Sequence, residues 1–137
     1  MVTPERFAQG MTCAAYLAQM RSNKERFEQR MAATELTSAD REAIGARKLK
    51  ILVITEDWCG DALVGFPGLA RLVEQAPDVE MRVFLRDANP DVMDQYLKRG
   101  LYRTIPVFVF FDEHMTELAR FMERQDVVTE LRTVLKV

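Results

Sequence analysis

The stretch of sequence that decides the fold is LKILVITEDWCGDA, at residues 49–62. Its apolar run at residues 51–54 is rich in β-branched side chains, which is typical of a strand buried on both faces of a sheet. A helical pattern of apolar residues follows, made of Leu63, Phe66, Leu69, Ala70 and Val73. The sequence therefore predicts a strand, a short turn that holds Cys59, and a helix that begins directly after the turn.

Strands and helices alternate beyond this unit. The helix is expected to bend near Pro67, because a proline inside a helix removes a backbone hydrogen bond. Residues 79–85 alternate apolar and polar side chains, as a half-buried strand does, and residues 91–98 form the next expected helix. Pro90 suits the first turn of that helix, and Asn89 is its expected cap.

The remaining sequence predicts a hairpin and a last helix. Residues 107–111 and 117–122 read as two strands joined by a turn, and a helix follows that begins at Arg124 or Asp126. The element order in residues 49–137 is thus β-α-β-α-β-β-α, which is an α/β pattern. Right-handed crossovers make the first strands parallel and the hairpin adds an antiparallel edge, so we expect a mixed central sheet.

Residues 1–48 read as an N-terminal helical extension packed on this core. One apolar helix face is predicted by the spacing of Phe7, Met11, Ala14 and Leu17. Ser22 followed by Glu25 has the form of a capping box for a second helix, and Thr37 can cap a third. The length of the chain suits one domain, so we expect extension and core to form a single domain over residues 1–137.

The composition argues against several classes of protein. The chain has 19 basic and 21 acidic residues, a net charge of -2, so no overall field points to nucleic acid or anionic lipid. The longest apolar stretch, residues 105–111, is far shorter than the roughly 20 residues that cross a bilayer. The N-terminal segment lacks the apolar run of a secretory signal. These features predict a soluble, cytoplasmic protein without a nucleic-acid or membrane partner.

The chain has two cysteines, Cys13 and Cys59, and a single histidine, His114. So few cysteines do not make a disulfide-stapled secreted module, and they suit a reducing cytosol. Structural zinc sites take about four nitrogen or sulfur ligands and catalytic ones about three. We therefore expect no metal site, and no feature of the sequence indicates a cofactor.

Chemistry is expected at Cys59. Unpaired backbone N–H groups and the positive end of the helix dipole stabilise a thiolate at a helix N-terminus. The thiolate is the species that attacks disulfides. Taken alone, one cysteine after a strand is weak evidence of function, because free cysteines are often merely small buried apolar residues.

The order of features along the chain resembles the thioredoxin superfamily. The matching features are the strand before Trp58-Cys59-Gly60, the helix broken at Pro67, the stretch Asp87-Ala88-Asn89-Pro90, and Thr104-Ile105-Pro106 before the third strand. The resemblance covers residues 49–137 and implies a thioredoxin-like fold, to which this chain adds the N-terminal helical extension.

The resemblance also implies roles for residues of two segments. Cys59 would be the attacking thiol, and the turn around it would be formed by Trp58, Gly60, Asp61 and Ala62. Pro106 would follow a cis peptide bond and lie against the cysteine, where the backbone at Ile105 would dock an extended substrate strand. From the residues alone, Pro106 is equally explained as the first residue of a strand.

The chain departs from the family pattern at this site. Ala62 stands where the family has its second, resolving cysteine, so a mixed disulfide at Cys59 would need an external thiol. Val53 and Val83 stand where the family has a buried acid and its lysine partner, which exchanges an ion pair for apolar packing. Asp61 replaces a proline, and its carboxylate opposes a second negative charge nearby.

Other polar residues near the turn allow more than one interpretation. Glu56 and Asp57 extend the acidic rim, and we interpret them as solvated turn residues or as charges at a helix N-terminus. Cys13 could resolve a mixed disulfide if its Cα atom lay within about 7 Å of that of Cys59. The alternative is that Cys13 is a structural or exposed thiol.

Two functions remain open from the sequence. The first is monothiol thiol-disulfide redox activity, with impaired dithiol activity. In it Cys59 reacts with a disulfide-containing or glutathionylated protein or a small thiol, and an external thiol resolves the intermediate. The second is a non-catalytic binding module that docks an extended peptide beside Pro106 by strand addition.

Overall fold

The structure is a computed structural model that describes residues 1–123 and 126–135. Its helices and strands are, in chain order, α1 (Pro4–Phe7), α2 (Cys13–Gln19), α3 (Lys24–Ala33), α4 (Ser38–Gly45), β1 (Leu49–Thr55), α5 (Ala62–Val73), β2 (Val79–Leu85), α6 (Pro90–Met93), β3 (Val107–Asp112), β4 (Glu117–Met122) and α7 (Val127–Leu135). From β1 onward this is the β-α-β-α-β-β-α order predicted from the sequence.

The strands form one sheet in the order β2-β1-β3-β4. β1 pairs with β2 in parallel, and Val53 lies opposite Val83. On its other side β1 pairs with β3 in the antiparallel sense, and Val53 lies opposite Phe108. β3 and β4 form the antiparallel hairpin. The expected mixed sheet is therefore confirmed.

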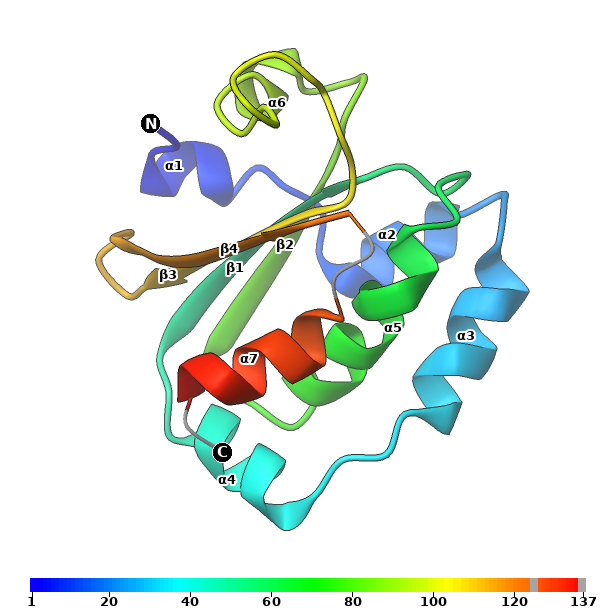
Figure 1. Cartoon of the computed structure of the whole chain (residues 1–137), viewed down its shortest axis with the longest axis vertical. Coiled ribbons are helices and arrows are strands. Elements are labelled where there is room, and N and C mark those ends of the chain that lie inside the picture. The colour runs from blue at the N-terminus through cyan, green and yellow to red at the C-terminus, as the bar shows by residue number, and fades with distance from the viewer. Residues whose placement is uncertain (124–125, 136–137) are drawn as a thin grey trace.

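Helices cover both faces of this sheet (Figure 1). Successive side chains of a strand point to opposite faces, so Ile51 and Val53 enter one core while Leu52 and Ile54 enter the other. The first core is covered by α2, α3, α4, α5 and α7, and the second by α1 and α6. β1 is therefore buried on both faces, as its apolar run predicts.

The first predicted helix is in fact two short helices. The Thr12 hydroxyl accepts a hydrogen bond from the N–H of Ala15 at 3.1 Å and so begins α2. Before it, Met11 pairs in the antiparallel sense with Val83 at the free edge of β2, through N–H to oxygen distances of 2.9 and 2.7 Å. The prediction of one continuous helix is wrong, because pairing with the sheet edge outweighs the helical spacing of the apolar residues.

Capping follows the prediction at one helix and not at another. The box predicted at Ser22 does not form, because Asn23 precedes α3 in the left-handed region, with φ 62°, and makes no side-chain cap. The N–H of Ser22 instead donates to the Asp57 carboxylate. At α4, Thr37 forms a complete capping box with Asp40.

α6 is shorter than the helix predicted over residues 91–98. Asn89 does not cap it through its side chain. The Asn89 amide donates to the carbonyl of Leu85 at 2.9 Å, and its oxygen accepts from Arg6 at 2.8 Å. The bond to Arg6 comes from α1, 83 positions away, so a local pattern gives no sign of it.

α5 and α7 begin close to where the sequence places them. α5 is assigned as one helix that contains the buried Pro67. The Asp126 carboxylate accepts hydrogen bonds from the N–H groups of Val128 and Thr129 at 3.2 and 3.4 Å, so it caps α7. Arg124, the other predicted start, lies outside the described residues. No helix within the described ranges is long and apolar enough to span a bilayer.

Candidate functional site

Cys59 lies on the turn that connects β1 to α5. Its N–H donates to the carbonyl of Glu56 at 3.1 Å, and its carbonyl accepts from the N–H of Ala62 at 3.3 Å. The next N–H groups, of Leu63 and Val64, donate to the carbonyls of Gly60 and Asp61. The turn therefore passes directly into the helix, and Cys59 stands just before the helix N-terminus.

The structure brings Cys59 next to the segment that precedes β3. The Cys59 thiol donates to the carbonyl oxygen of Ile105, with 3.8 Å between sulfur and oxygen, across 46 positions of sequence. The Ile105–Pro106 peptide bond is cis, as the resemblance implies. Cys59 is 9 % exposed and Ile105 6 % exposed, so both residues are buried, and Cys59 belongs to the second core.

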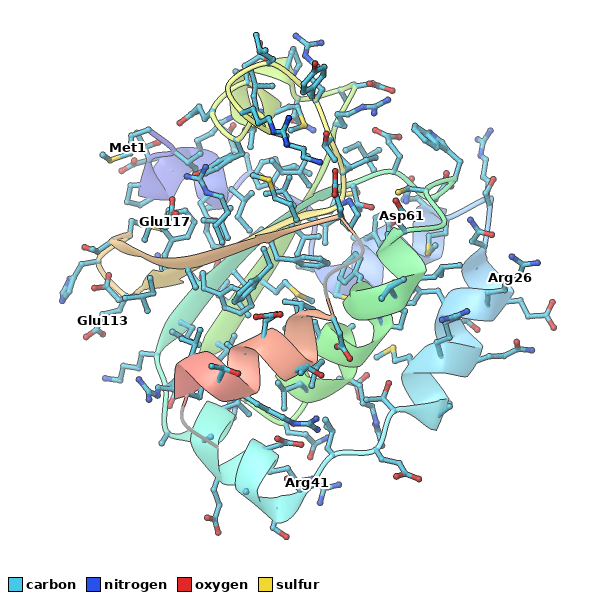
Figure 2. The ribbon with its side chains drawn as sticks, in the orientation of Figure 1. Met1, Arg26, Arg41, Asp61, Glu113 and Glu117 are labelled. Atoms are coloured by element: carbon cyan, nitrogen blue, oxygen red, sulfur yellow. The ribbon has the colours of Figure 1, made fainter. Side chains whose placement is uncertain are left out.

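The other residues of the turn differ in exposure. Trp58 is 53 % exposed, and the guanidinium of Arg86 lies over its ring, 5.1 Å from the centroid. Gly60 is exposed, and a side chain there would meet nothing within 4 Å. Ala62 is buried, and Figure 2 shows Asp61 at the start of α5. The residues predicted for the site thus lie on two segments that meet at the sulfur.

Apolar side chains lie at three positions where the sequence departs from the pattern of the family that it resembles. Val53 and Val83 are register partners in neighbouring strands and are both buried. Ala62 contributes a methyl group to the core that contains Cys59. The apolar packing inferred from the sequence at Val53 and Val83 is present in the structure.

Cys13 lies away from this site. It lines a pocket of about 320 Å³ together with Ala70 and Val73 of the last turn of α5 and with Glu74, the residue after that helix. Because a helix rises about 1.5 Å per residue, these residues lie two to three turns along α5 from the end at which Cys59 stands. Burial, followed by the charge of Glu74, raises the pKa of the Cys13 thiol to about 11. The hypothesis of a distant resolving thiol is therefore not supported.

Glu56 and Asp57 are more than solvated residues of the turn. The Glu56 carboxylate accepts from the N–H of Asp87 at 3.1 Å, after β2. The Asp57 carboxylate accepts from the N–H groups of Arg21 and Ser22 at 2.8 and 3.3 Å, before α3. Both residues lie on the turn and are partly exposed, as the sequence predicts, and their contacts with backbone donors are additional to that prediction. The sequence carries no signal for these contacts, because their donors are backbone groups of distant segments.

Tyr16 is a further residue at the site that the sequence did not indicate. It is 1 % exposed, and its ring packs against Phe66 of α5 with 5.5 Å between centroids. Burial, then the negative charge of Asp57, raises the pKa of the Tyr16 hydroxyl, while a hydrogen bond with the Thr55 side chain opposes the shift. An aromatic residue at helical spacing is typical of a core, so no local pattern points to its hydroxyl.

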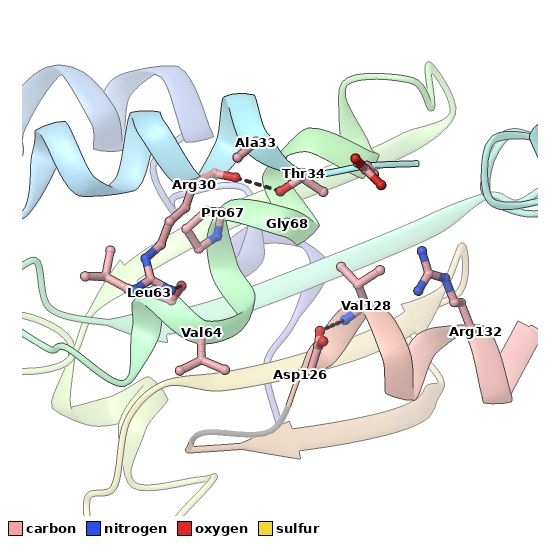
Figure 3. A pocket seen from close by; sticks show the side chains of 11 residues that line it. Arg30, Ala33, Thr34, Leu63, Val64, Pro67, Gly68, Asp126, Val128 and Arg132 are labelled. Atoms are coloured by element: carbon pink, nitrogen blue, oxygen red, sulfur yellow. Dashed lines mark hydrogen bonds between the residues drawn. The ribbon is translucent and has the colours of Figure 1, made fainter. Parts of the chain in front are cut away.

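A separate pocket of about 310 Å³ lies between α3, α5 and α7 (Figure 3). Its two arginines are already engaged: Arg30 donates to the carbonyl of Leu63 at 3.3 Å, and Arg132 binds Asp40. Among the described residues, no group of three or more His, Cys, Asp or Glu side chains is placed to hold a metal ion. The site at Cys59 therefore remains the candidate for chemistry.

The comparison with known proteins gives a family and a set of folds. The sequence model of the family described as Thioredoxin matches residues 10–136, which includes most of the N-terminal extension. No curated protein matches the chain by sequence. A crystal structure of a Pseudomonas aeruginosa protein of unknown function is 26 % identical, with a TM-score of 0.74 over 95 % of this chain and 82 % of that one.

Two other solved structures are also similar to the chain. An HIV epitope-scaffold is 24 % identical, with a TM-score of 0.74 over 98 % of this chain and 88 % of that one. A thioredoxin from Fasciola hepatica is 24 % identical, with a TM-score of 0.51 over 72 % of this chain and 86 % of that one. The family match spans nearly the whole sequence and agrees with the sheet and the cis proline segment. The chain therefore belongs to the thioredoxin family.

Proposed function

We propose that the protein carries out monothiol thiol-disulfide exchange through Cys59. The observation that carries this proposal is the position of the Cys59 sulfur, 3.8 Å from the Ile105 carbonyl and next to the cis peptide bond at Pro106. A substrate chain extended along this segment would bring a disulfide to the sulfur. The exposed ring of Trp58 provides an apolar surface beside it.

The reaction has two exchange steps. In the first, the thiolate of Cys59 attacks one sulfur of a disulfide R–S–S–R′; the bond from Cys59 to R forms, and R′ leaves as a thiolate that takes a proton from water. In the second, an external thiolate attacks the sulfur of R, a new disulfide forms, and Cys59 leaves as a thiolate. The protein is neither oxidised nor reduced overall.

The external thiol is needed because Ala62 stands one helical turn from Cys59 where a second thiol would resolve the intermediate. The substrates we propose are disulfide-containing or glutathionylated proteins and small thiols. A reducing compartment such as the cytoplasm, where thiols are abundant, would supply the resolving partner. Reduction that depends on an internal dithiol should be very weak.

The test is reaction of the purified protein with a glutathionylated peptide, followed by mass spectrometry of the intact chain. We expect a mixed disulfide on Cys59 that added glutathione removes, retained in Cys13→Ser and lost in Cys59→Ser. A mixed disulfide that forms equally well in Cys59→Ser, or no adduct in any variant, would overturn the proposal.

A second candidate is a non-catalytic module that docks an extended peptide beside Pro106. The low exposure of Cys59, 9 %, favours it, because a docked strand needs the backbone at Ile105 more than it needs the sulfur. Capture of a partner that persists in Cys59→Ser would support this function. Capture that depends on Cys59 and is released by reducing agent would support exchange.

A further inference from the structure

The two carboxylates that precede the thiol bind backbone groups on opposite sides of the turn. Glu56 accepts from Asp87 after β2, at 3.1 Å. Asp57 accepts from Arg21 and Ser22, at 2.8 and 3.3 Å, in the linker between α2 and α3. The turn that carries Cys59 is thus held by the sheet on one side and by the N-terminal extension on the other.

The extension contacts the same turn at two further points. The side-chain amide of Asn23 donates to the carbonyl of Asp57 at 3.0 Å. Asn23 has φ 62°, the left-handed conformation that asparagine tolerates better than most residues. Tyr16 of α2 lies close enough to Thr55, the last residue of β1, for the Thr55 side chain to oppose the rise in the pKa of the Tyr16 hydroxyl. Residues 16–23 therefore contact both the end of the strand and the turn.

Hydrogen bonds from N–H groups to a carboxylate are stronger than those between neutral groups. The bonds to Asp57 also satisfy two N–H groups of the linker between α2 and α3. One of them, that of Ser22, lies just before α3. Each carboxylate is therefore directed at backbone donors. Its main effect on the turn is to fix the backbone, with the negative charge partly compensated by those donors.

We propose that Asp57 is a positioning residue for Cys59, which makes the linker between α2 and α3 a structural part of the thiol site. This inference rests on the proposed exchange function. It assigns the N-terminal extension a role at the site: the linker holds the turn in the geometry in which the sulfur faces the Ile105 carbonyl. Glu56 does the same from the side of β2.

The proposal and a purely electrostatic role of Asp57 predict opposite results. If the charge mattered most, both Asp57→Asn and Asp57→Ala would ease thiolate formation and speed the reaction of Cys59. If position matters most, Asp57→Asn keeps an oxygen acceptor and reacts close to the parent rate. Asp57→Ala loses the acceptor and slows by about tenfold, well inside the roughly 10²-fold that an ångström of misplacement can cost.

The experiment uses the full chain with Cys13→Ser as the parent, so that Cys59 is the only thiol. The rate of mixed-disulfide formation with a glutathionylated peptide is measured for Asp57→Asn and Asp57→Ala. Asp78→Ala is the matched control, because Asp78 is exposed and lies beside the start of β1, at the other end of the sheet. The control is expected to react at the parent rate.

Amide hydrogen exchange provides a readout that does not depend on redox chemistry. In Asp57→Ala we expect faster exchange at Arg21, Ser22 and the turn that holds Cys59, with unchanged protection in β3. Asn23→Gly removes the amide donor and tolerates the positive φ, so it should loosen the same turn if Asp57→Ala fails to fold.

The proposal would be overturned if Asp57→Ala matched the parent both in the rate of mixed-disulfide formation and in amide hydrogen exchange. Faster mixed-disulfide formation in both Asp57 variants would also overturn it. If the parent forms no mixed disulfide, the exchange function fails. The rates of amide hydrogen exchange then still decide whether Asp57 holds the turn.

Discussion

The carboxylate of Asp40 binds two nitrogens of the Arg132 guanidinium, at 2.8 and 2.7 Å, across 92 positions of sequence. The Asp40 side chain is 2 % exposed, and it also accepts from the N–H of Thr37 at the start of α4. This pair joins α4, from the N-terminal extension, to α7 at the end of the chain. The hydrogen bonds from Arg132 hold the pKa of Asp40 well below its usual range.

We expect Asp40→Asn to lower the free energy of unfolding at pH 7 by about 2 kcal/mol, the order of a hydrogen bond to a charged group. Because the pKa of Asp40 is lowered by folding, its contribution is fully present above the ordinary value of 3.8 and is lost as the pH falls below it. The difference between the two proteins in urea unfolding should therefore be constant from about pH 5 to 7 and shrink from about pH 4 downward.

Asp91→Asn is the control for this experiment. Asp91 also binds an arginine, Arg6, but its carboxylate is exposed. Exposed pairs contribute little to stability, so the melting temperature should barely change. A difference between wild type and Asp40→Asn that does not depend on pH would contradict the assignment.

Gly10→Ala is expected to destabilise the fold by about 1 to 3 kcal/mol, the usual cost of overpacking. A Cβ atom at Gly10 would stand 2.6 Å from the Phe84 ring and 2.8 Å from the Cβ atom of Arg82. Gly45→Ala is the matched control, since a Cβ atom there meets nothing within 4 Å. Thermal unfolding of the two variants measures the contrast. Equal melting temperatures would contradict the prediction and would mean that Phe84 and Arg82 of β2 can move to make room for the added atom.

Cys13 should react slowly with iodoacetamide in the folded Cys59→Ser protein at pH 8. Burial raises its pKa to about 11, so only a small fraction is thiolate at that pH. The labelling rate should rise about tenfold per pH unit up to pH 10 and level off near the pKa. The same variant unfolded in urea provides the control and should label quickly at pH 8. Fast labelling of the folded protein would mean that the thiol is accessible and ionised.

Ala62→Cys should restore an internal resolving thiol. The N–H of Ala62 donates to the carbonyl of Cys59, so the two residues are the first and last of one four-residue turn. In such a turn their Cα atoms are closer than about 7 Å, which a disulfide requires. We expect the oxidised variant to have no free thiol at the site. The reduced variant, kept reduced by dithiothreitol as the electron source, should reduce insulin at least about tenfold faster than the parent. Ala70→Cys adds a buried thiol farther along α5 and should give no such gain.

Local sequence patterns sufficed for the parts of the fold that local physics controls. The apolar run of β1 predicts burial on both faces, and the hairpin of β3 and β4 follows from strand patterns on either side of a turn. The capping box at Thr37 also needs only neighbouring residues. The resemblance, and no local pattern, supplied the cis bond at Pro106 and the approach of Ile105 to Cys59.

Several of the errors occur where a distant segment competes with the local pattern. Met11 leaves the helix because Val83 offers strand pairing. The Ser22 N–H, which the predicted capping box pairs with Glu25, is bound by Asp57. The Asn89 side chain binds Leu85 and Arg6. The same reason hid the function of the carboxylates beside Cys59, since a sequence does not tell which backbone donors will reach them.

The pairing of Met11 with Val83 has a consequence for solubility. A strand at the border of a sheet exposes unpaired backbone groups that invite another copy of the chain to add a strand there. β2 is such a border strand, and residues before α2 occupy its midpoint. Met11 thus occupies backbone groups of β2 that another chain could otherwise pair with, and a chain shortened to begin at α2 would expose them.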